Sequence, residues 1–354
     1  MDIIFYAPTG KSMSPDRIGG AESGCLKTMK ILRDAGMRVI LLEKPVRKAS
    51  LVSYILRVFA TWLRLLGLLV SHRKAVLHVA GCYRGLMYVE WLFVMSAKVL
   101  GHKAVYEIRN GGMTVEYERR GKLYKRGMLS LLGHSDSVLC QGMDYVRFIK
   151  EKLGKSALYY PNYLQDHFVD GYPQRDMGQC RLVYFGRIAP AKNIGIMPEV
   201  CRILRERGIA ATLDLIGGYS DTYKTELDDK IRQAGLADGV RFWGRKDFEA
   251  FSPYLRTCHF FLFPSDEPRE GHSNSLTEAM GCGIVPIVSD AGFNRQVVND
   301  DRLVIPVMNA VAYADAVYEI WTGGQWESRS RKMYLRVVEN FTESRVREVL
   351  LAAY

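Results

Sequence analysis

Leu182-Val183-Tyr184-Phe185-Gly186, an apolar run that ends in glycine, has the composition of a buried strand followed by a turn. One set of strand-like runs precedes it and a second set starts with it, and helical stretches separate the runs of both sets. The predicted strands span residues 2–7, 38–43, 75–80, 103–108, 137–141, 182–186, 211–216, 240–243, 260–264, 285–289 and 302–305. Alternation of strands and helices is typical of parallel α/β sheets, so the sequence predicts two doubly wound, Rossmann-like domains that face each other across a cleft.

Residues 160–180 separate the two sets of strands and lack apolar periodicity, with proline and glycine at intervals. The predicted N-terminal domain covers 1–165, the linker 166–180 and the C-terminal domain 181–335. Residues 336–354 are predicted to form a C-terminal helix whose docking the sequence leaves open. Because ligands of doubly wound sheets bind outside the carboxyl ends of the strands, we expect the site in the cleft between the domains.

Positive charge is concentrated in the first part of the chain. The 354 residues hold 49 Lys and Arg against 38 Asp and Glu, and residues 1–170 alone hold 26 basic against 14 acidic side chains. This imbalance indicates an anionic partner for the first domain, and nucleic acid, anionic lipid and a phosphorylated acceptor all fit it. Nucleic acid is not expected, because the basic segment is rich in leucine rather than in interleaved stacking aromatics.

Residues 50–71 predict an apolar helix with a narrow polar stripe that contains Arg57 and Arg64. The two arginines interrupt every run long enough to span a bilayer, so we expect the helix to lie on a membrane surface. The residues expected to face the anionic headgroups are Arg57, Arg64, Arg73 and Lys74, with a second basic cluster between Arg119 and Arg126. The alternative is a helix buried between the sheet and its neighbours.

Seven cysteines occur without a C-x-x-C pair, and no basic, apolar leader precedes the predicted strand at 2–7. These features predict reduced thiols and a cytoplasmic chain, held peripherally on the inner face of the cell membrane. The histidines show no metal-ligand spacing, and no metal site is expected. The oligomeric state is left open.

Two glycine-containing loops follow the strands that begin the two sets. Ile18-Gly19-Gly20-Ala21-Glu22 precedes a predicted helix, and its glycines allow a ligand to approach the backbone. The alternative is a turn that starts a helix. In the second loop, Arg187 and Lys192 stand five residues apart and suit a diphosphate, arginine as a planar fork and lysine as a point charge. Alternatively, both charges belong to a solvated loop and pair with nearby acids.

The segment Glu270–Met280, EGHSNSLTEAM, carries the carboxylates Glu270 and Glu278 around a predicted helix start. Backbone N–H groups of 271–275 at such a start form an anion-binding nest. Two carboxylates beside this nest suit a sugar nucleotide, whose hydroxyls need acceptors and whose phosphates need donors. For Glu278 the alternative is a capping box with Ser275, whereas Glu270 has no such alternative.

The three motifs together resemble the GT-B glycosyltransferases of the retaining family-four type, also described as glycosyl transferases group 1, over nearly the whole chain. Gly19-Gly20 matches the family's N-terminal glycine loop, and Pro161-Asn162 matches the segment before the hinge. Gly186-Arg187 with Lys192 matches the phosphate clamp, and Glu270-x7-Glu278 matches the acidic motif.

The resemblance implies roles for individual residues. Arg187 and Lys192 would neutralise the departing diphosphate, Glu270 would bind the donor sugar, and Glu278 would bind the ribose. The catalytic residues would be Glu270, Arg187 and Lys192. The donor-binding residues would be Gly19, Gly20, Arg187, Lys192, Gly244, Arg245, Glu270, Gly271, His272, Ser273, Asn274, Ser275 and Glu278.

The resemblance also implies a metal-independent reaction that retains the anomeric configuration, in which the leaving phosphate oxygen takes the acceptor proton. The sequence has no Asp-x-Asp motif, so cationic side chains would carry the leaving-group charge. No cofactor is expected beyond a nucleoside-diphosphate sugar as co-substrate, with UDP expected from family frequency.

One position departs from the family. Where many members carry a histidine that contacts the donor sugar, this chain has Arg109-Asn110, after the predicted strand at 103–108. Because arginine stays protonated at neutral pH, we expect Arg109 and Asn110 to bind the acceptor, through its phosphate or hydroxyl groups. His272 is expected to offer ring or backbone contacts rather than to act as a base.

The predicted function is a hexosyl- or N-acetylhexosaminyltransferase that moves a sugar from a nucleoside-diphosphate donor to a lipid-linked or other saccharide acceptor. The basic first domain and its apolar helix favour a lipid-linked acceptor in cell-envelope polysaccharide, O-antigen or capsule assembly. Three alternatives remain open: a sugar-nucleotide epimerase of GT-B fold, a basic protein that binds nucleic acid or membrane without catalysis, and a non-catalytic scaffold that binds a sugar nucleotide.

Overall fold

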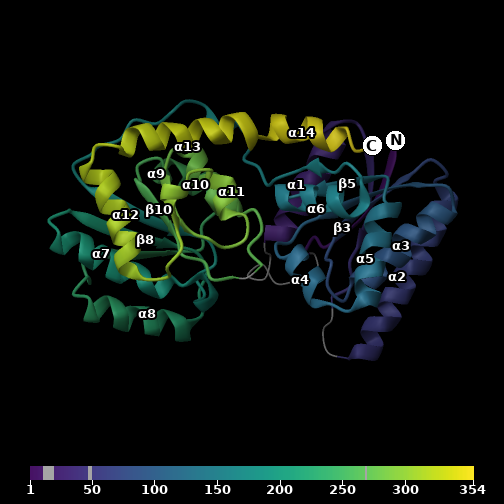
Figure 1. Cartoon of the computed structure of the whole chain (residues 1–354), viewed down its shortest axis with the longest axis horizontal. Coiled ribbons are helices and arrows are strands. Elements are labelled where there is room, and N and C mark those ends of the chain that lie inside the picture. Colours follow the sequence, from purple (N-terminus) through teal and green to yellow (C-terminus); the bar gives the residue numbers. More distant parts are fainter. Residues whose placement is uncertain (11–19, 47–49, 268) are drawn as a thin grey trace. The chain divides into compact units, whose positions relative to one another are not determined.

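A computed structural model describes residues 1–10, 20–46, 50–267 and 269–354, and its contacts divide the chain into two units. The first unit comprises Met1–Pro161 and Val346–Tyr354, and the second comprises Asn162–Arg345. Each unit contains one six-stranded parallel sheet with helices on it (Figure 1). The predicted α/β class with two doubly wound sheets is therefore confirmed.

The first unit has the strand order β2-β1-β3-β4-β5-β6. Its elements are β1 (Asp2–Ala7), α1 (Gly20–Asp34), β2 (Arg38–Glu43), α2 (Leu51–Ser71), β3 (Val76–Gly81), α3 (Met87–Val99), β4 (Lys103–Ile108), α4 (Met113–Arg119), α5 (Lys122–His134), β5 (Ser137–Cys140), α6 (Met143–Leu153), β6 (Leu158–Tyr159) and α14 (Glu343–Leu351), which leads into the unit from Val346 on. Right-handed crossovers put α1 on one face of the sheet and α2, α3 and α5 on the other.

The second unit has the strand order β12-β11-β10-β7-β8-β9. Its elements are the 3₁₀ turn η2 (Asp166–Val169), β7 (Cys180–Phe185), the turns η3 (Pro190–Lys192) and η4 (Ile194–Ile196), α7 (Met197–Glu206), β8 (Ala211–Ile216), α8 (Asp221–Gln233), β9 (Val240–Gly244), α9 (Phe248–Leu255), β10 (Phe260–Phe263), α10 (Asn274–Gly281), β11 (Val285–Ser289), α11 (Asn294–Val298), the turn η5 (Asp301–Leu303), β12 (Val304–Ile305), α12 (Ala310–Thr322) and α13 (Trp326–Asn340).

Strand order reverses once in each sheet. β1 pairs with both β2 and β3, and β7 pairs with both β8 and β10, all in parallel. The chain leaves these central strands in opposite directions, and doubly wound sheets bind their ligands outside the carboxyl ends of the strands at such a reversal, here at β7 and β10. This reversal positions the candidate site.

The prediction of one helix over 336–354 is wrong, because this segment holds the end of α13 and the separate helix α14. Main-chain hydrogen bonds from Leu164 N–H to the Phe341 carbonyl oxygen (2.8 Å) and from Glu343 N–H to the Leu164 carbonyl oxygen (2.9 Å) interrupt it, so α13 ends and α14 begins. The end of α14 packs within the first unit, where the Tyr354 hydroxyl contacts His78 of β3. Residues 166–180 belong to the second unit, which begins at Asn162.

A buried ion pair stabilises the carboxyl edge of the first sheet. The Lys44 ammonium contacts Oε1 of Glu90, which also accepts from the Cys82 N–H (2.8 Å). Tyr106 donates to the other oxygen of Glu90 at 2.7 Å. Although burial by itself lowers it, the Glu90 carboxylate raises the pKa of Lys44 above its ordinary value.

Replacement Glu90→Ala is expected to lower the free energy of unfolding by about 3–5 kcal/mol, because it leaves the Lys44 charge buried without its counter-ion. Urea denaturation followed by circular dichroism measures the loss. In the control Lys44→Met/Glu90→Leu, both charges are replaced by apolar groups, and we expect at least half of the lost stability to return. Equal stabilities of the single and double variants would contradict this account.

Candidate functional site

Close main-chain contact joins the loops that follow β7 and β8. Gly186 N–H donates to the Ile216 carbonyl oxygen and Ile188 N–H to that of Gly218, both at 3.0 Å. Gly217 has a φ of 153°, and a Cβ there would lie 1.7 Å from the Gly186 carbonyl oxygen. Only glycine permits this approach. These contacts fix the backbone of the loop after β7, which carries Arg187.

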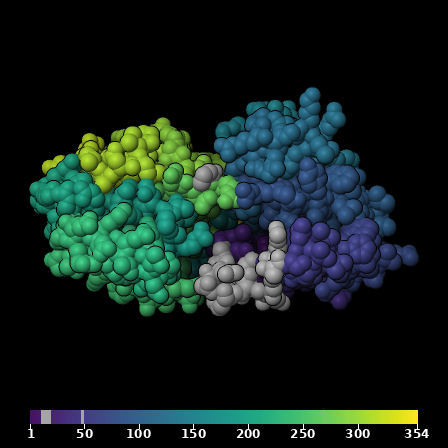
Figure 2. Space-filling model, turned by 90° about the horizontal axis from the view of Figure 1, so that it is seen from below, coloured from purple at the N-terminus to yellow at the C-terminus, as the bar shows by residue number. Residues whose placement is uncertain are grey.

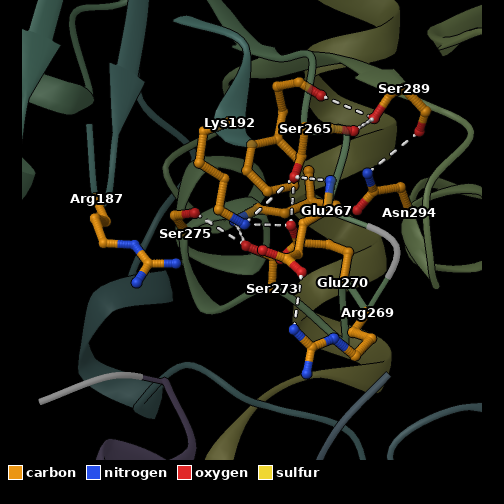
Figure 3. Close-up of polar contacts among 12 residues, drawn as sticks. Arg187, Lys192, Ser265, Glu267, Arg269, Glu270, Ser273, Ser275, Ser289 and Asn294 are labelled. Carbon is orange, nitrogen blue, oxygen red and sulfur yellow. Dashed lines mark hydrogen bonds and ion pairs between the residues drawn. The ribbon is translucent and has the colours of Figure 1, made fainter. Parts of the chain in front are cut away.

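Arg187 is an exposed cation at this edge. Its carbonyl oxygen accepts from the buried Tyr184 hydroxyl at 2.9 Å, which anchors its backbone. Burial raises the pKa of Tyr184, so the hydroxyl keeps its proton. Among the residues that the structure describes, none forms an ion pair with the Arg187 guanidinium, which lies beside Ser275 in Figure 3. The side chain is available to an anion from solution.

Lys192, Ser265 and Glu270 make one polar cluster from two loops. The Lys192 ammonium contacts Oε2 of Glu270 and donates to Ser265 Oγ at 3.3 Å (Figure 3). Ser265 Oγ donates to the same Glu270 oxygen at 2.5 Å. Asp266 N–H also donates to the Ala191 carbonyl oxygen at 3.1 Å. The loop after β7 and the loop after β10 are therefore joined through both side chains and backbone.

The backbone of Glu270 packs directly against Gly292. A Cβ at Gly292, whose φ is 54°, would lie 1.8 Å from the Glu270 carbonyl oxygen. The Ser265 backbone is held by Ser289 of β11, whose hydroxyl donates to the Ser265 carbonyl oxygen at 2.7 Å. These contacts leave the Glu270 side chain 11% exposed, so its carboxylate is largely shielded from water yet open at one side.

Helix α10 begins beside this cluster. Ser273 caps its N-terminus by accepting from Leu276 N–H, and the hydroxyls of Ser273 and Ser275 lie 3.0 Å apart. The alternative capping box of Ser275 with Glu278 is wrong, because the cap is Ser273 and both residues lie inside the helix. Free backbone N–H groups at this helix start and the Arg187 and Lys192 cations suit an anionic ligand.

His272 lies beneath the helix start and is fully enclosed. Its Nε2 lies 2.7 Å from Thr277 Oγ1, its ring contacts Phe341 edge-on, and its carbonyl oxygen accepts from Asn162 Nδ2 at 2.5 Å. Burial lowers the pKa of His272 to about 3. A buried imidazole that stays neutral across physiological pH positions the loop and does not serve as a base for a ligand.

The remaining predicted donor residues divide between the units. Gly244 joins the site edge, since its carbonyl oxygen accepts from Gly217 N–H at 2.8 Å, and the exposed Arg245 follows it. Gly271 precedes His272 in the same loop, and Asn274 is the first residue of α10. Gly20 begins α1 of the first unit, and Gly19 lies outside the described residues.

The predicted acceptor residues lie in the first unit. Arg109 is buried, pairs with Oε1 of Glu107 at 2.7 Å, and donates to the Gly24 carbonyl oxygen at 3.0 Å and to Thr28. Although burial by itself raises it, Arg109 lowers the pKa of Glu107. The Asn110 carbonyl oxygen accepts from the Tyr145 hydroxyl at 2.8 Å. Acceptor binding by Arg109 stays a prediction, and its guanidinium is already held by these neighbours.

Sequence reasoning missed Ser265 and Gly292. Ser265 directly follows the predicted strand at 260–264, and the carboxyl end of a strand at the switch point is where a ligand-facing hydroxyl is expected. Gly292 comes three residues after the predicted strand at 285–289. Position at a strand end was the available signal for both residues.

The substitution His272→Gln is expected to make the free energy of unfolding less dependent on pH below about 6.5. The unfolded chain binds a proton at a histidine pKa near 6.5, whereas folded His272 does so only near 3. The stability that depends on neutral His272 is therefore complete above pH 6.5 and is lost as the pH falls from there towards 3. Urea denaturation at pH 7 and pH 4.5 measures the difference.

The control for this experiment is His134→Gln, at an exposed histidine of α5, which should keep the wild-type slope. If His272→Gln loses as much stability between the two pH values as the wild type does, the enclosed neutral imidazole is contradicted.

Known proteins resemble the second unit in sequence and the whole chain in fold. Residues 179–322 match the family model described as glycosyl transferases group 1. The amylovoran biosynthesis glycosyltransferase AmsK of Erwinia amylovora is 34% identical over 113 residues, an alignment that covers 31% of this chain and 27% of that protein. The match thus spans less than a third of the relative's length.

Two solved structures share the fold over almost all of both chains. Sucrose-phosphate synthase from Thermosynechococcus elongatus has a TM-score of 0.74 at 17% identity, covering 100% of this chain and 98% of that one. Anabaena HepE in complex with UDP has a TM-score of 0.74 at 14% identity and covers 99% of each chain. Residues 179–322 therefore match the glycosyl transferases group 1 model, and the whole chain has the GT-B fold that these solved structures share.

Proposed function

We propose that the chain is a glycosyltransferase whose second unit binds a nucleoside-diphosphate sugar and transfers the sugar to a saccharide acceptor. The observation that carries the proposal is the cluster of Lys192, Glu270 and Ser265, with Arg187 at its edge, at the point where the strand order reverses. The family match of this unit and the UDP complex of a protein with the same fold support it.

The cluster suits the charge changes of glycosyl transfer. When the bond between the anomeric carbon and the diphosphate breaks, negative charge grows on the departing oxygen. Arg187 and Lys192 stabilise that charge, and preorganised cations in a shielded site do so more effectively than water. Glu270 accepts hydrogen bonds from sugar hydroxyls and orients the ammonium of Lys192 through direct contact. Glu278 of α10 would accept from the ribose.

The reaction we propose retains the anomeric configuration and uses no metal ion. The acceptor oxygen bonds to the anomeric carbon on the face that the diphosphate leaves, and its proton passes to the departing phosphate oxygen. This route needs no protein base, which agrees with a Glu270 carboxylate occupied by Lys192 and Ser265 and with a neutral His272. The two cations take the part that Mg²⁺ has in metal-dependent enzymes.

The proposal also covers the acceptor, the biosynthetic process, and the sugar and nucleotide of the donor. The relative from Erwinia amylovora is named for amylovoran biosynthesis, and by analogy we propose a role in cell-envelope polysaccharide, O-antigen or capsule assembly. The excess of 26 basic over 14 acidic side chains in residues 1–170 suits a lipid-diphosphate-linked saccharide at the cytoplasmic face of the membrane. We propose hexose or N-acetylhexosamine as the transferred sugar and UDP as the nucleotide.

Substitutions Lys192→Met and Glu270→Gln are each expected to reduce kcat by at least about 100-fold, because each removes one charge of a preorganised site. Nucleoside diphosphate release from UDP-glucose, UDP-N-acetylglucosamine and GDP-mannose, with undecaprenyl-diphosphate-linked saccharides as acceptors, measures turnover. The matched control Lys152→Met changes an exposed lysine of α6 and should stay within about twofold of wild type. Near-normal turnover in Lys192→Met, or conversion of the donor without an acceptor, would defeat the assignment.

Chelation is expected to leave turnover unchanged. With EDTA present, kcat should stay within about twofold of its value without chelator, because the side-chain cations supply the leaving-group charge. Loss of activity that Mg²⁺ or Mn²⁺ restores would contradict the metal-independent route.

A further inference from the structure

Helix α2 is a long apolar helix that the first unit leaves almost uncovered. It has 21 residues with a mean hydropathy of 1.5 in its most apolar window, only 6% of which is buried. Leu65 and Leu69 are its buried residues. The predicted alternative of a helix buried between the sheet and its neighbours is therefore wrong. A helix this apolar and this exposed needs a partner to cover it.

The helix has three faces at about 100° per residue. Leu65, Leu69 and Trp62 point to the body of the unit. A polar stripe carries Arg57 and Arg64. The third face spans an arc of about 100° and is apolar and exposed, with side chains between 49% and 66% exposed. Its residues are Val52, Ile55, Leu56, Phe59, Leu63 and Val70.

The apolar face of α2 continues onto α3. Trp62 Nε1 donates to Ser96 Oγ of α3 at 3.0 Å, which places α3 next to the apolar face and away from the arginine stripe. The outward residues of α3 include the exposed Tyr88 and Leu92. Figure 2 shows the violet-blue of α2, the blue of α3 and the blue-green of α4 and α5 following one another across this face of the unit.

Basic side chains border this apolar surface at the N-terminal end of α5. The Tyr88 ring contacts that of Tyr124 edge-on, so this end of α5 lies beside α3. Lys122 and Arg126 are exposed there, and neither forms an ion pair with a residue that the structure describes. On the other border, α2 carries Arg57 and no acidic side chain. An apolar centre with basic borders complements an anionic bilayer, which offers acyl chains below negative headgroups.

We propose that the exposed apolar face of α2, together with Tyr88 and Leu92 of α3 and the cations of α5, docks the first unit onto an anionic lipid bilayer. The helix lies in the headgroup region and does not cross the membrane. Leu65 and Leu69 hold it to the unit, and Ala75 N–H donates to the His72 carbonyl oxygen at 2.8 Å, immediately before β3 pairs with β1. Leaving the unit would break these contacts.

The orientation of the helices decides which edge meets the membrane. α2, α3 and α5 each run antiparallel to the strands, so their N-terminal ends lie at the carboxyl edge of the sheet, where Arg109 and Asn110 follow β4. Arg73 and Lys74 follow the other end of α2, about 30 Å along the helix. Arg73 and Lys74 are exposed and follow Val70 at that end, so their contact with headgroups stays a prediction, whereas Lys122 and Arg126 supply basic side chains at the carboxyl edge.

Sedimentation with lipid vesicles tests the docking surface. The full chain is expected to pellet with vesicles of phosphatidylglycerol and phosphatidylcholine and to remain in solution with phosphatidylcholine alone. Ile55→Glu/Phe59→Glu should weaken binding at least tenfold, because it puts two charges into the acyl region. Lys122→Glu/Arg126→Glu should weaken it about tenfold and make the remaining binding less sensitive to salt.

The matched controls are Val311→Glu on α12, an exposed apolar residue of the second unit, and Lys152→Glu on α6. Both should bind vesicles as wild type does. All substituted residues are exposed, and unchanged thermal unfolding confirms that each variant is folded. Wild-type binding by Ile55→Glu/Phe59→Glu would overturn the proposal. So would a dimer in light scattering that the same variant dissociates, because a second copy would then cover the face.

Alkaline carbonate separates docking from insertion. Protein bound to cell membranes should be released by carbonate or by high salt, whereas protein that stays in the membrane after both washes would show that α2 spans it and would overturn the interfacial orientation. The docking proposal does not depend on the proposed reaction. The variant Lys192→Met retains the docking surface and lacks the catalytic cation. It should therefore bind vesicles as wild type does, which tests the docking proposal independently of the proposed reaction.

Discussion

The contact between Lys192 and Glu270, with Ser265 bonded to both, is the interaction on which the candidate site depends. It joins two loops that lie far apart in sequence and adjacent in space, because they follow neighbouring strands at the reversal of strand order. The pair is largely shielded, so removing either charge leaves the other without its counter-ion. The proposed donor satisfies both partners at once, since its diphosphate attracts the ammonium and its sugar hydroxyls donate to the carboxylate.

Glycine makes this arrangement possible at two places. Gly217 lets the loop after β8 touch the Gly186 carbonyl oxygen, and Gly292 lets the loop after β11 touch that of Glu270. In each case a side chain would occupy the space of a neighbouring backbone. Backbone contacts therefore hold the loops that carry the functional side chains, and such a preorganised site does not have to reorganise as charge develops.

The sequence could predict the two parallel sheets because strand composition, helical stretches and the restart at 182 are local signals. It also placed Arg187, Lys192 and Glu270 correctly at the carboxyl ends of strands, since loops that follow parallel strands share one edge. The cap at Ser273 was missed, because three nearby polar residues could each start the helix. The partner of Arg109 could have been found, since Glu107 lies two residues earlier and alternate residues of an extended segment point to the same side.

Other features depend on contacts that no local pattern contains. The break between α13 and α14 follows from hydrogen bonds to Leu164, far away in sequence. The exposure of α2 depends on how few neighbours reach it, because the same apolar composition suits a buried helix equally well. The division of the tail between the units depends on the end of α14, whose Tyr354 reaches His78 inside the first unit.

The central claim is that the site at the reversal of strand order binds a diphosphate through Arg187 and Lys192. Isothermal titration of the full chain with nucleoside, nucleoside monophosphate and nucleoside diphosphate, for uridine and guanosine, measures how much each phosphate contributes. The account predicts that the diphosphate of the preferred base binds at least ten times more tightly than its nucleoside, and that Arg187→Met/Lys192→Met abolishes this difference. Equal affinities in the wild type, or a difference that survives the double substitution, would contradict it.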